Sequence, residues 1–236
     1  EYLFRFSKII VSGGVIQAKC VGIFDPKGSK QKKCHTIKLY ISHSKWWRPY
    51  PGCFVFVYIL TPSLFWQRHP ITVLQDADDP SNTDIVLLIK VKNGMTKRLA
   101  DIVSASPDGH CTIPILLEGP YGSAISLKRY TNSLFFAGGI GFTAVYSLAI
   151  DSAKEILSQL RSGERKSDYL NIDSSDDIEN TEIKEDSREK KSSPIIVNWF
   201  IPHLQSLEIF INEVMYLSQF GPALVNINIY ITRWDL

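Results

Sequence analysis

A change in hydrophobic pattern near the middle of the chain constrains the fold most strongly. Before residue 122, apolar residues fall in short runs rich in β-branched and aromatic side chains, and His35–His43 alternates between apolar and polar positions. After residue 130, strand-like runs alternate with longer helical segments. Strands joined by tight turns favour an antiparallel barrel, whereas strands separated by helices favour a parallel sheet. The pattern predicts a β barrel plus an α/β domain, covering residues 1–122 and 123–236.

The individual elements follow from the same periodicity. Early strands are expected at Phe6–Val11, Val15–Phe24, His35–His43, Cys53–Leu60, Ile71–Leu74 and Ile85–Val91. A short helix is expected from Thr96 to Ser104, with Thr96 as its N-cap. The strands that alternate with helices are expected at Ile113–Leu117, Ser133–Ala137, Ile195–Phe200 and Val225–Thr232. Their helices are expected at Thr143–Leu160 and Leu204–Ser218.

The charge of the chain argues against nucleic acid as its partner. The 26 basic and 24 acidic residues are nearly balanced. The stretch Ser162–Ser193 holds ten acidic and six basic residues, which leaves 20 basic against 14 acidic residues elsewhere, a balance suited to anionic cofactors. Because Ser162–Ser193 is polar and nearly free of aromatics, it is expected to be a disordered insertion, either a solvated loop or a phosphorylation target.

Neither a metal site nor a membrane span is predicted from the remaining signals. The cysteines at 20, 34, 53 and 111 have no zinc-finger spacing and are expected to be reduced thiols. Two uncharged windows, Pro49–Gln67 and Thr131–Ile150, approach the length of a membrane helix, but their prolines and glycines favour strands and turns. No signal peptide is visible, and the first residue, Glu1, in place of a Met suggests a piece of a longer protein.

Three short motifs could hold a ligand. Leu134–Thr143 runs from an apolar strand through three closely spaced glycines into a helix, so its backbone could approach a pyrophosphate. Gly119-Pro-Tyr-Gly122 forms a tight turn at the domain junction, where ligands often bind. Arg68-His-Pro-Ile-Thr72 places an imidazole and a hydroxyl at the start of a strand. Each motif taken alone could equally be structural.

The order of the motifs is more informative than any one of them. His69-Pro-Ile-Thr72, Asn93-Gly-Met-Thr96, Gly119-Pro-Tyr-Gly122 and Ala137-Gly-Gly-Ile-Gly-Phe-Thr143 together resemble the signature of the ferredoxin–NADP reductase superfamily. More specifically, the chain resembles the cytosolic dehydrogenase region of the fungal ferric/cupric reductases and their relatives, the NADPH oxidases. The resemblance implies an antiparallel flavin-binding barrel followed by a parallel-sheet nucleotide-binding domain, with FAD and NADPH as cofactors.

The same resemblance implies roles for the motif residues. Those that would line the flavin are His69, Pro70, Ile71 and Thr72, with Ile71 standing where the family usually has Phe. The FAD pyrophosphate would lie at Gly94 and Thr96. The floor between flavin and nicotinamide would be Gly119, Pro120, Tyr121 and Gly122.

On the nucleotide side, the NADPH pyrophosphate would be received by Gly138, Gly139, Gly141 and Thr143. The ribose 2′-phosphate would contact Thr232 and Arg233, although Arg233 could equally be an exposed cation at a strand end. No residue is expected to act in catalysis itself, because hydride transfer belongs to the cofactors.

The function implied is that of an oxidoreductase module. Hydride would pass from NADPH to FAD, and single electrons would then pass to haem in an N-terminal transmembrane domain, for the reduction of ferric or cupric ions or of oxygen. The module would lie on the cytosolic face of a membrane as part of a multi-pass protein. Family members end in a Cys-Gly-Pro segment, and no cysteine follows Cys111, so C-terminal truncation is expected. The alternative is a non-catalytic nucleotide-binding regulatory module descended from such a reductase.

Overall fold

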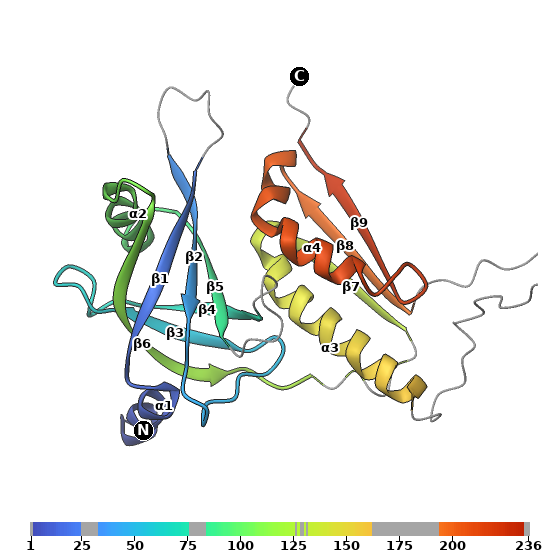
Figure 1. Cartoon of the computed structure of the whole chain (residues 1–236), viewed down its shortest axis with the longest axis horizontal. Coiled ribbons are helices and arrows are strands. Elements are labelled where there is room, and N and C mark those ends of the chain that lie inside the picture. The colour runs from blue at the N-terminus through green and yellow to red at the C-terminus, as the bar shows by residue number, and fades with distance from the viewer. Residues whose placement is uncertain are drawn as a thin grey trace, which may run out of the picture.

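A closed barrel and a parallel sheet stand side by side in the computed structural model (Figure 1). The structure describes residues 2–24, 33–75, 84–125, 127, 130, 132–161 and 194–233. The predicted insertion Ser162–Ser193 lies outside the described residues.

The barrel contains six antiparallel strands in the order β1-β2-β5-β4-β3-β6. They are β1 (Val15–Phe24), β2 (Cys34–Ile41), β3 (Phe54–Ile59), β4 (Arg68–Gln75), β5 (Ile85–Lys90) and β6 (His110–Tyr121). Alternation along β3 buries Val55, Val57 and Ile59 in the barrel core and turns the intervening aromatic residues outward. Two helices, α1 (Tyr2–Ser12) and α2 (Met95–Ala105), pack on the outside.

The second unit is a three-stranded parallel sheet with helical crossovers. Its strands, in the order β7-β8-β9, are β7 (Ser133–Gly138), β8 (Ile195–Ile201) and β9 (Val225–Ile231). A 3₁₀ turn at Gly139–Gly141 leads from β7 into α3 (Phe142–Arg161), and a second one at Leu204–Phe210 leads into α4 (Ile211–Ser218). Right-twisted parallel strands and helical crossovers thus bring the carboxyl ends of all three strands to one edge.

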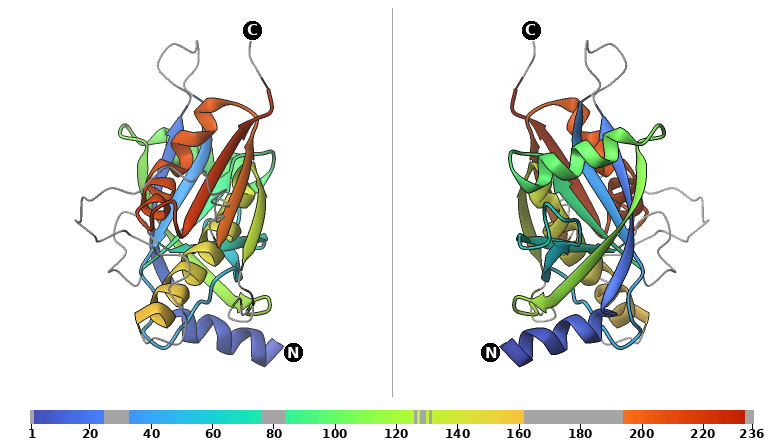
Figure 2. Two further views of the ribbon diagram at one scale, coloured as in Figure 1. Left: turned by 90° about the vertical axis from the view of Figure 1, so that its right-hand side faces the viewer. Right: turned by 90° about the vertical axis from the view of Figure 1, so that its left-hand side faces the viewer.

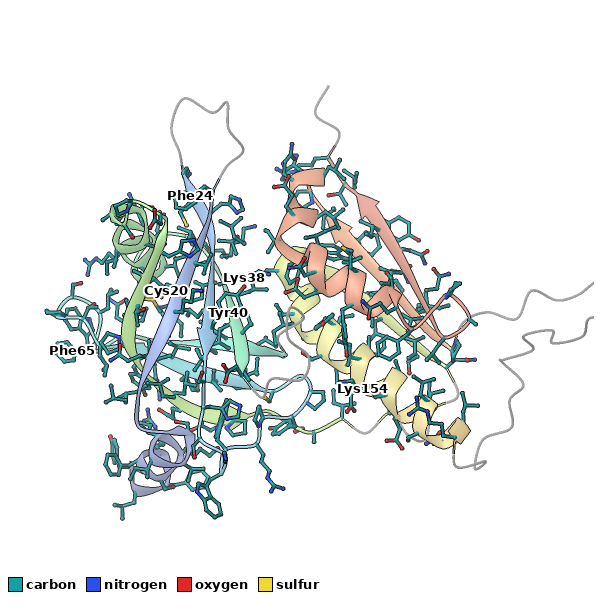
Figure 3. The ribbon with its side chains drawn as sticks, in the orientation of Figure 1. Cys20, Phe24, Lys38, Tyr40, Phe65 and Lys154 are labelled. Atoms are coloured by element: carbon teal, nitrogen blue, oxygen red, sulfur yellow. The ribbon has the colours of Figure 1, made fainter. Side chains whose placement is uncertain are left out.

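Helix α3 lies between the sheet and the barrel (Figures 1 and 2). Its buried face shares a core with Leu74, Val86 and Leu88 from the outer side of the barrel. The Ser147 hydroxyl donates to the Val73 carbonyl at 3.2 Å. A buried ion pair joins Lys38 Nζ of β2 to Glu213 Oε1 of α4 at 3.1 Å, and Figure 3 shows Lys38 on the side of the barrel that faces α4. These contacts hold the two units together.

The predicted fold class is confirmed, with differences in three of its elements. The helix expected over Leu204–Ser218 is divided, because Leu204–Phe210 forms a 3₁₀ helix and only Ile211–Ser218 is α-helical. Phe6–Val11, expected as a strand, belongs to helix α1. The helix places Arg5, Lys8 and Ser12 on one face, from which their side chains bond to β6. Ile113–Leu117, grouped with the parallel strands, lies in β6 and closes the barrel between β1 and β3. The division at residue 122 stays a prediction. No described helix is long and apolar enough to cross a membrane.

Candidate functional site

Strand β3 brings the two predicted flavin motifs together. In the register of the barrel, Thr72 of β4 pairs with Phe54 of β3, and Phe54 pairs on its other side with Tyr121 of β6. Three residues far apart in the sequence therefore form one row across the outer face of the barrel. Pro70 joins this face opposite Phe56.

The outward aromatic residues of β3 form a cluster with Tyr121. The Phe54 and Tyr121 rings stack at 5.8 Å between centroids, and Phe56 meets Tyr121 edge-on at 5.6 Å. Neither phenylalanine was predicted as a site residue, although the strict alternation of β3 places both on one face. The cluster offers a flat, apolar floor beside the Thr72 hydroxyl, which suits a planar ring system.

The other two residues of the His69–Thr72 motif lie differently. His69 pairs with Val57 and is exposed, and Ile71 pairs with Val55 and packs partly against the barrel core. Alternation along β4 thus divides the motif, because Pro70 and Thr72 share the face of the aromatic cluster whereas His69 and Ile71 do not.

A buried carboxylate lies next to the Gly119–Gly122 turn and bonds to Tyr121 within it. Glu118 is only 1% exposed and accepts hydrogen bonds from the hydroxyls of Tyr58 and Tyr121 and from the guanidinium of Arg5, at 3.0 and 3.1 Å. Arg68 adds a weaker contact at 3.4 Å. Burial raises the pKa of Glu118, but these hydrogen bonds and the Arg5 charge outweigh it and leave the pKa below its usual value.

Tyr121 is fixed by Glu118 and Lys8 as well as by the two phenylalanines. Its hydroxyl donates to Glu118 Oε1 at 2.7 Å, and Lys8 Nζ lies 3.7 Å from its ring centroid. Burial and the hydrogen bond to Glu118 raise its pKa to about 12, so the phenol remains protonated and continues to donate. The aromatic ring at the domain junction is therefore held in one orientation.

Each of the two glycines in this turn is required for a different structural reason. A Cβ at Gly119 would lie 2.9 Å from Val55 Cγ1, so β3 and β6 approach too closely for a side chain. Gly122 has φ +110°, which side chains rarely tolerate. The Trp47 indole donates to the Gly119 carbonyl at 2.9 Å, and the Tyr50 hydroxyl donates to the Gly122 carbonyl at 2.7 Å. The turn is rigid.

The amino end of α2 is open to an anion. Its N-cap is Gly94, with φ +80°, and no heavy atom lies within 4 Å of a Cβ built there. The expected N-cap, Thr96, lies inside the helix and exchanges hydrogen bonds with the backbone of Lys92 instead. Arg98 donates to the Ser63 carbonyl and ties this helix to the loop that precedes β4.

The glycine turn after β7 is also open. No heavy atom lies within 4 Å of a Cβ built at Gly138, Gly139 or Gly141, so backbone faces free space at the amino end of α3. The Trp199 indole donates to the Gly139 carbonyl at 2.9 Å and anchors the turn to β8. Thr143 is buried, and its hydroxyl donates to the Ile140 carbonyl at 3.1 Å.

Thr232 and Arg233 lie at the same edge of the sheet as this turn. Gly138 is in register with Phe200, which is in register with Tyr230, two positions before Thr232. The backbone amides of Thr232 and Arg233 donate to the carbonyls of Ile201 and Pro202, at 2.8 and 3.0 Å. Both side chains are exposed beyond the carboxyl ends of the strands, where nucleotides bind in parallel sheets.

A surface pocket exists elsewhere, at the opposite edge of the sheet. It is lined by Pro51, Ala124, Ile125, Leu127, Tyr130, Ser133, Asp151, Ser152, Glu155, Ile156 and Gln159. Ser133 begins β7, whereas the glycine turn follows its end, so this pocket is separate from the edge that carries the glycine turn, Thr232 and Arg233. Within the described ranges, no group of three metal-binding side chains occurs, and the four cysteines are thiols outside any disulfide.

Comparisons with known proteins agree with this geometry. The FAD-binding domain family matches residues 28–125, and the ferric reductase NAD binding domain family matches residues 130–236. The chain belongs to the ferric reductase family. Both matches begin after α1.

Several fungal ferric reductases are similar in sequence. Ferric reductase transmembrane component 5 of Saccharomyces cerevisiae is 32% identical over 161 residues, which are 67% of this chain and 23% of the relative. Ferric/cupric reductase transmembrane component 1 of Candida albicans is 32% identical over 199 residues, which are 84% of this chain and 21% of the relative. The chain therefore spans about a quarter of the length of these relatives.

Solved structures share the fold. The ferredoxin–NADP+ reductase of Plasmodium falciparum with 2′P-AMP superposes with a TM-score of 0.56 at 13% identity, over 94% of this chain and 74% of that one. A ferredoxin NADP+ reductase from Neisseria gonorrhoeae with bound FAD and NADP gives 0.53 at 13% identity, over 94% of this chain and 70% of that one. The chain thus has the fold of the ferredoxin–NADP reductases.

The residues present fit the two cofactors that the family names imply. Flat aromatic packing and a hydroxyl lie at Phe54, Tyr121 and Thr72, and open backbone lies at Gly94 for one pyrophosphate and at Gly138 for another. Each glycine position stands at the amino end of a helix, where phosphate is stabilised.

Proposed function

We propose that the chain is the FAD- and NADPH-binding electron-transfer module of a membrane-bound ferric or cupric reductase. The observation that carries the proposal is the row Thr72, Phe54 and Tyr121, which joins the two flavin motifs on one barrel face. The open glycine turn at Gly138–Gly141 supplies the second cofactor site in the adjoining unit. When bound, the two cofactors supply the hydride transfer.

The work of the chain is binding and orientation. Thr72 provides a hydroxyl at the flavin edge, the Phe54 and Tyr121 rings provide its floor, and Glu118 keeps the Tyr121 ring in place. The amino ends of α2 and α3 stabilise the two pyrophosphates through backbone N–H groups. Gly119–Gly122 lies between the two sites, where the reacting rings would meet.

NADPH is the proposed donor because of the cation at the nucleotide edge. Arg233 is exposed next to Thr232, and a 2′-phosphate with about two negative charges requires such donors. The proposed partner is an N-terminal transmembrane domain that carries haem, and the module would lie on the cytosolic face of that membrane. The proposed final acceptors are ferric and cupric ions, as the names of the relatives suggest.

The flavin assignment is tested by the double substitution His69→Ala with Thr72→Ala. The affinity for FAD, measured by the quenching of flavin fluorescence, should fall about tenfold or more, or roughly 1.4 kcal/mol, because the Thr72 hydroxyl is lost from the face of the aromatic cluster. The matched control is His110→Ala with Thr112→Ala, which removes the same side chains from exposed positions at the far end of β6. Equal affinities in the two double variants would contradict the assignment.

Measurement of NADPH oxidation distinguishes the alternative function from the proposed one. A non-catalytic regulatory module would bind both cofactors without oxidising NADPH. Oxidation of NADPH by the FAD-loaded chain with ferricyanide as acceptor supports the reductase, and binding of both cofactors without oxidation supports the regulatory module.

A further inference from the structure

Helix α1 has the reverse of the usual polarity of a surface helix. Its polar and cationic side chains face the barrel: the Arg5 guanidinium bonds to Glu118, Lys8 Nζ donates to the Pro120 carbonyl at 3.1 Å, and the buried Ser12 hydroxyl donates to the Leu117 carbonyl at 2.9 Å. These positions recur at the three- and four-residue spacing of one helix face. Every one of these contacts is made to residues 117–120 of β6.

The opposite face of α1 is open and, apart from the exposed Ser7, apolar. Leu3, Phe6 and Ile10, which also share one helix face, are 86%, 61% and 59% exposed. Tyr2, Phe4 and Val11 extend this apolar surface. A surface helix normally turns such a face inward, and a contiguous exposed patch of this kind marks an interaction site.

The surroundings of this face identify the kind of partner. The loop after β2 adjoins the end of α1, because the Ser44 amide donates to the Ser12 carbonyl at 3.1 Å. This loop presents Lys45, Arg48 and the 85% exposed Trp46. Helix α1 contains no acidic residue. Figures 1 and 2 show α1 at one end of the molecule, clear of the parallel sheet.

An apolar helix face beside exposed cations and a tryptophan fits a phospholipid surface. Aromatic rings and cationic side chains collect at the headgroup level of membranes, and basic residues are attracted to the anionic lipids of the cytosolic leaflet. A second copy of the chain fits less well. A two-fold interface places the same patch on both sides and would bring the cations of the two copies towards one another.

We propose that α1 lies in the interface of a phospholipid bilayer, with Leu3, Phe6 and Ile10 among the acyl chains and Lys45 and Arg48 at anionic headgroups. The proposal deepens and rests on the proposed membrane-bound reductase. Because α1 is bound to residues 117–120 through Arg5, Lys8 and Ser12, the contact would also hold the Tyr121 floor of the flavin site at a fixed height above the membrane.

The test is co-sedimentation of the purified 236-residue chain with vesicles of phosphatidylcholine and phosphatidylserine. The triple variant Leu3→Gln, Phe6→Gln and Ile10→Gln keeps good helix formers on α1 and should lower the vesicle affinity at least tenfold. The matched control is Phe65→Gln with Trp66→Gln, at 57% and 58% exposure in the loop before β4. Figure 3 shows Phe65 away from α1, and this variant should bind as the unchanged chain does.

A charge variant completes the vesicle test. Lys45→Ser with Arg48→Ser should remove the preference for phosphatidylserine over pure phosphatidylcholine vesicles. Equal vesicle affinity in the triple variant and the unchanged chain would overturn the proposal. It would also be overturned by an equal loss in the control pair, or by a dimer in solution that the triple variant dissociates.

FAD binding and NADPH oxidation are measured on the same samples. The triple variant should keep both at the level of the unchanged chain, with an unchanged thermal unfolding midpoint. Loss of vesicle binding with intact cofactor binding places the effect at α1. Absence of cofactor binding in the unchanged chain would count against the proposed function and leave the vesicle result to be judged separately.

Discussion

Substitution of Gly138 by Val separates a binding role of the glycine turn from a structural one. Gly138 has an extended backbone, with φ −114° and ψ 121°, and no heavy atom lies within 4 Å of a Cβ built there. Valine adopts this conformation readily. Gly139, by contrast, has φ +51°, so a side chain there would add backbone strain to any effect on binding.

The expected magnitudes differ sharply for folding and for binding. Because Gly138→Val meets no neighbour and restricts the unfolded chain, the free energy of unfolding should stay within about 1 kcal/mol of its value or rise slightly. The branched side chain would occupy the space from which a phosphate reaches the backbone. Loss of about two hydrogen bonds to a charged group costs roughly 3 kcal/mol, or about a hundredfold in the dissociation constant for NADPH.

The contrasting control is Gly119→Ala in the same chain. Its Cβ would lie 2.9 Å from Val55 Cγ1 and 3.3 Å from the Phe54 carbonyl, so the barrel should lose about 1–3 kcal/mol of stability. NADPH affinity is measured by isothermal titration calorimetry and stability by urea unfolding. An unchanged NADPH affinity in Gly138→Val, or a large loss of stability there, would refute the binding role of this turn.

Three further predictions follow from the contacts of the site. Hydrogen bonds from its neighbours hold the folded pKa of Glu118 below its unfolded value, so its contribution to stability is present at neutral pH and is lost as the pH falls through the folded pKa. Urea unfolding across acid pH should show this loss, and Glu118→Gln should make the free energy of unfolding less dependent on pH. Trp199→Phe removes the hydrogen bond to the Gly139 carbonyl, so the NADPH affinity should fall up to about tenfold while the FAD affinity is kept, as measured by separate titrations. Arg233→Ala should lower the affinity for NADPH about tenfold or more, roughly 1.4 kcal/mol, and barely change the affinity for NADH. Equal effects on the two affinities would place the 2′-phosphate site elsewhere.

The regular elements were predictable because their signals are local. The strand Val15–Phe24 was predicted with the bounds that the structure shows, since its alternation and flanking turns lie within the segment. The glycine turn was found for the same reason, because strand, glycines and helix follow one another directly. Helix α1 was misjudged as a strand, because the carboxylate that orients it, Glu118, is 113 residues away.

The supporting part of the site depends on strand register, which no local pattern contains. Phe54 and Phe56 alternate outward in any register, but only the pairing with Tyr121 places them beside the flavin motifs. Likewise, an isolated glutamate before a Gly-Pro turn gives no sign of burial. Its role emerges only when β3, β6 and α1 bring Tyr58, Tyr121 and Arg5 to one carboxylate.

Anaerobic titration of the FAD-loaded chain with NADPH tests the central claim most directly. If the barrel holds the flavin and the glycine turn holds the nicotinamide nucleotide in one reacting pair, the visible absorption of the bound flavin should bleach as NADPH is added. The same titration on Gly138→Val should require far more NADPH. A bound flavin that keeps its oxidised spectrum in the presence of saturating NADPH would contradict the account.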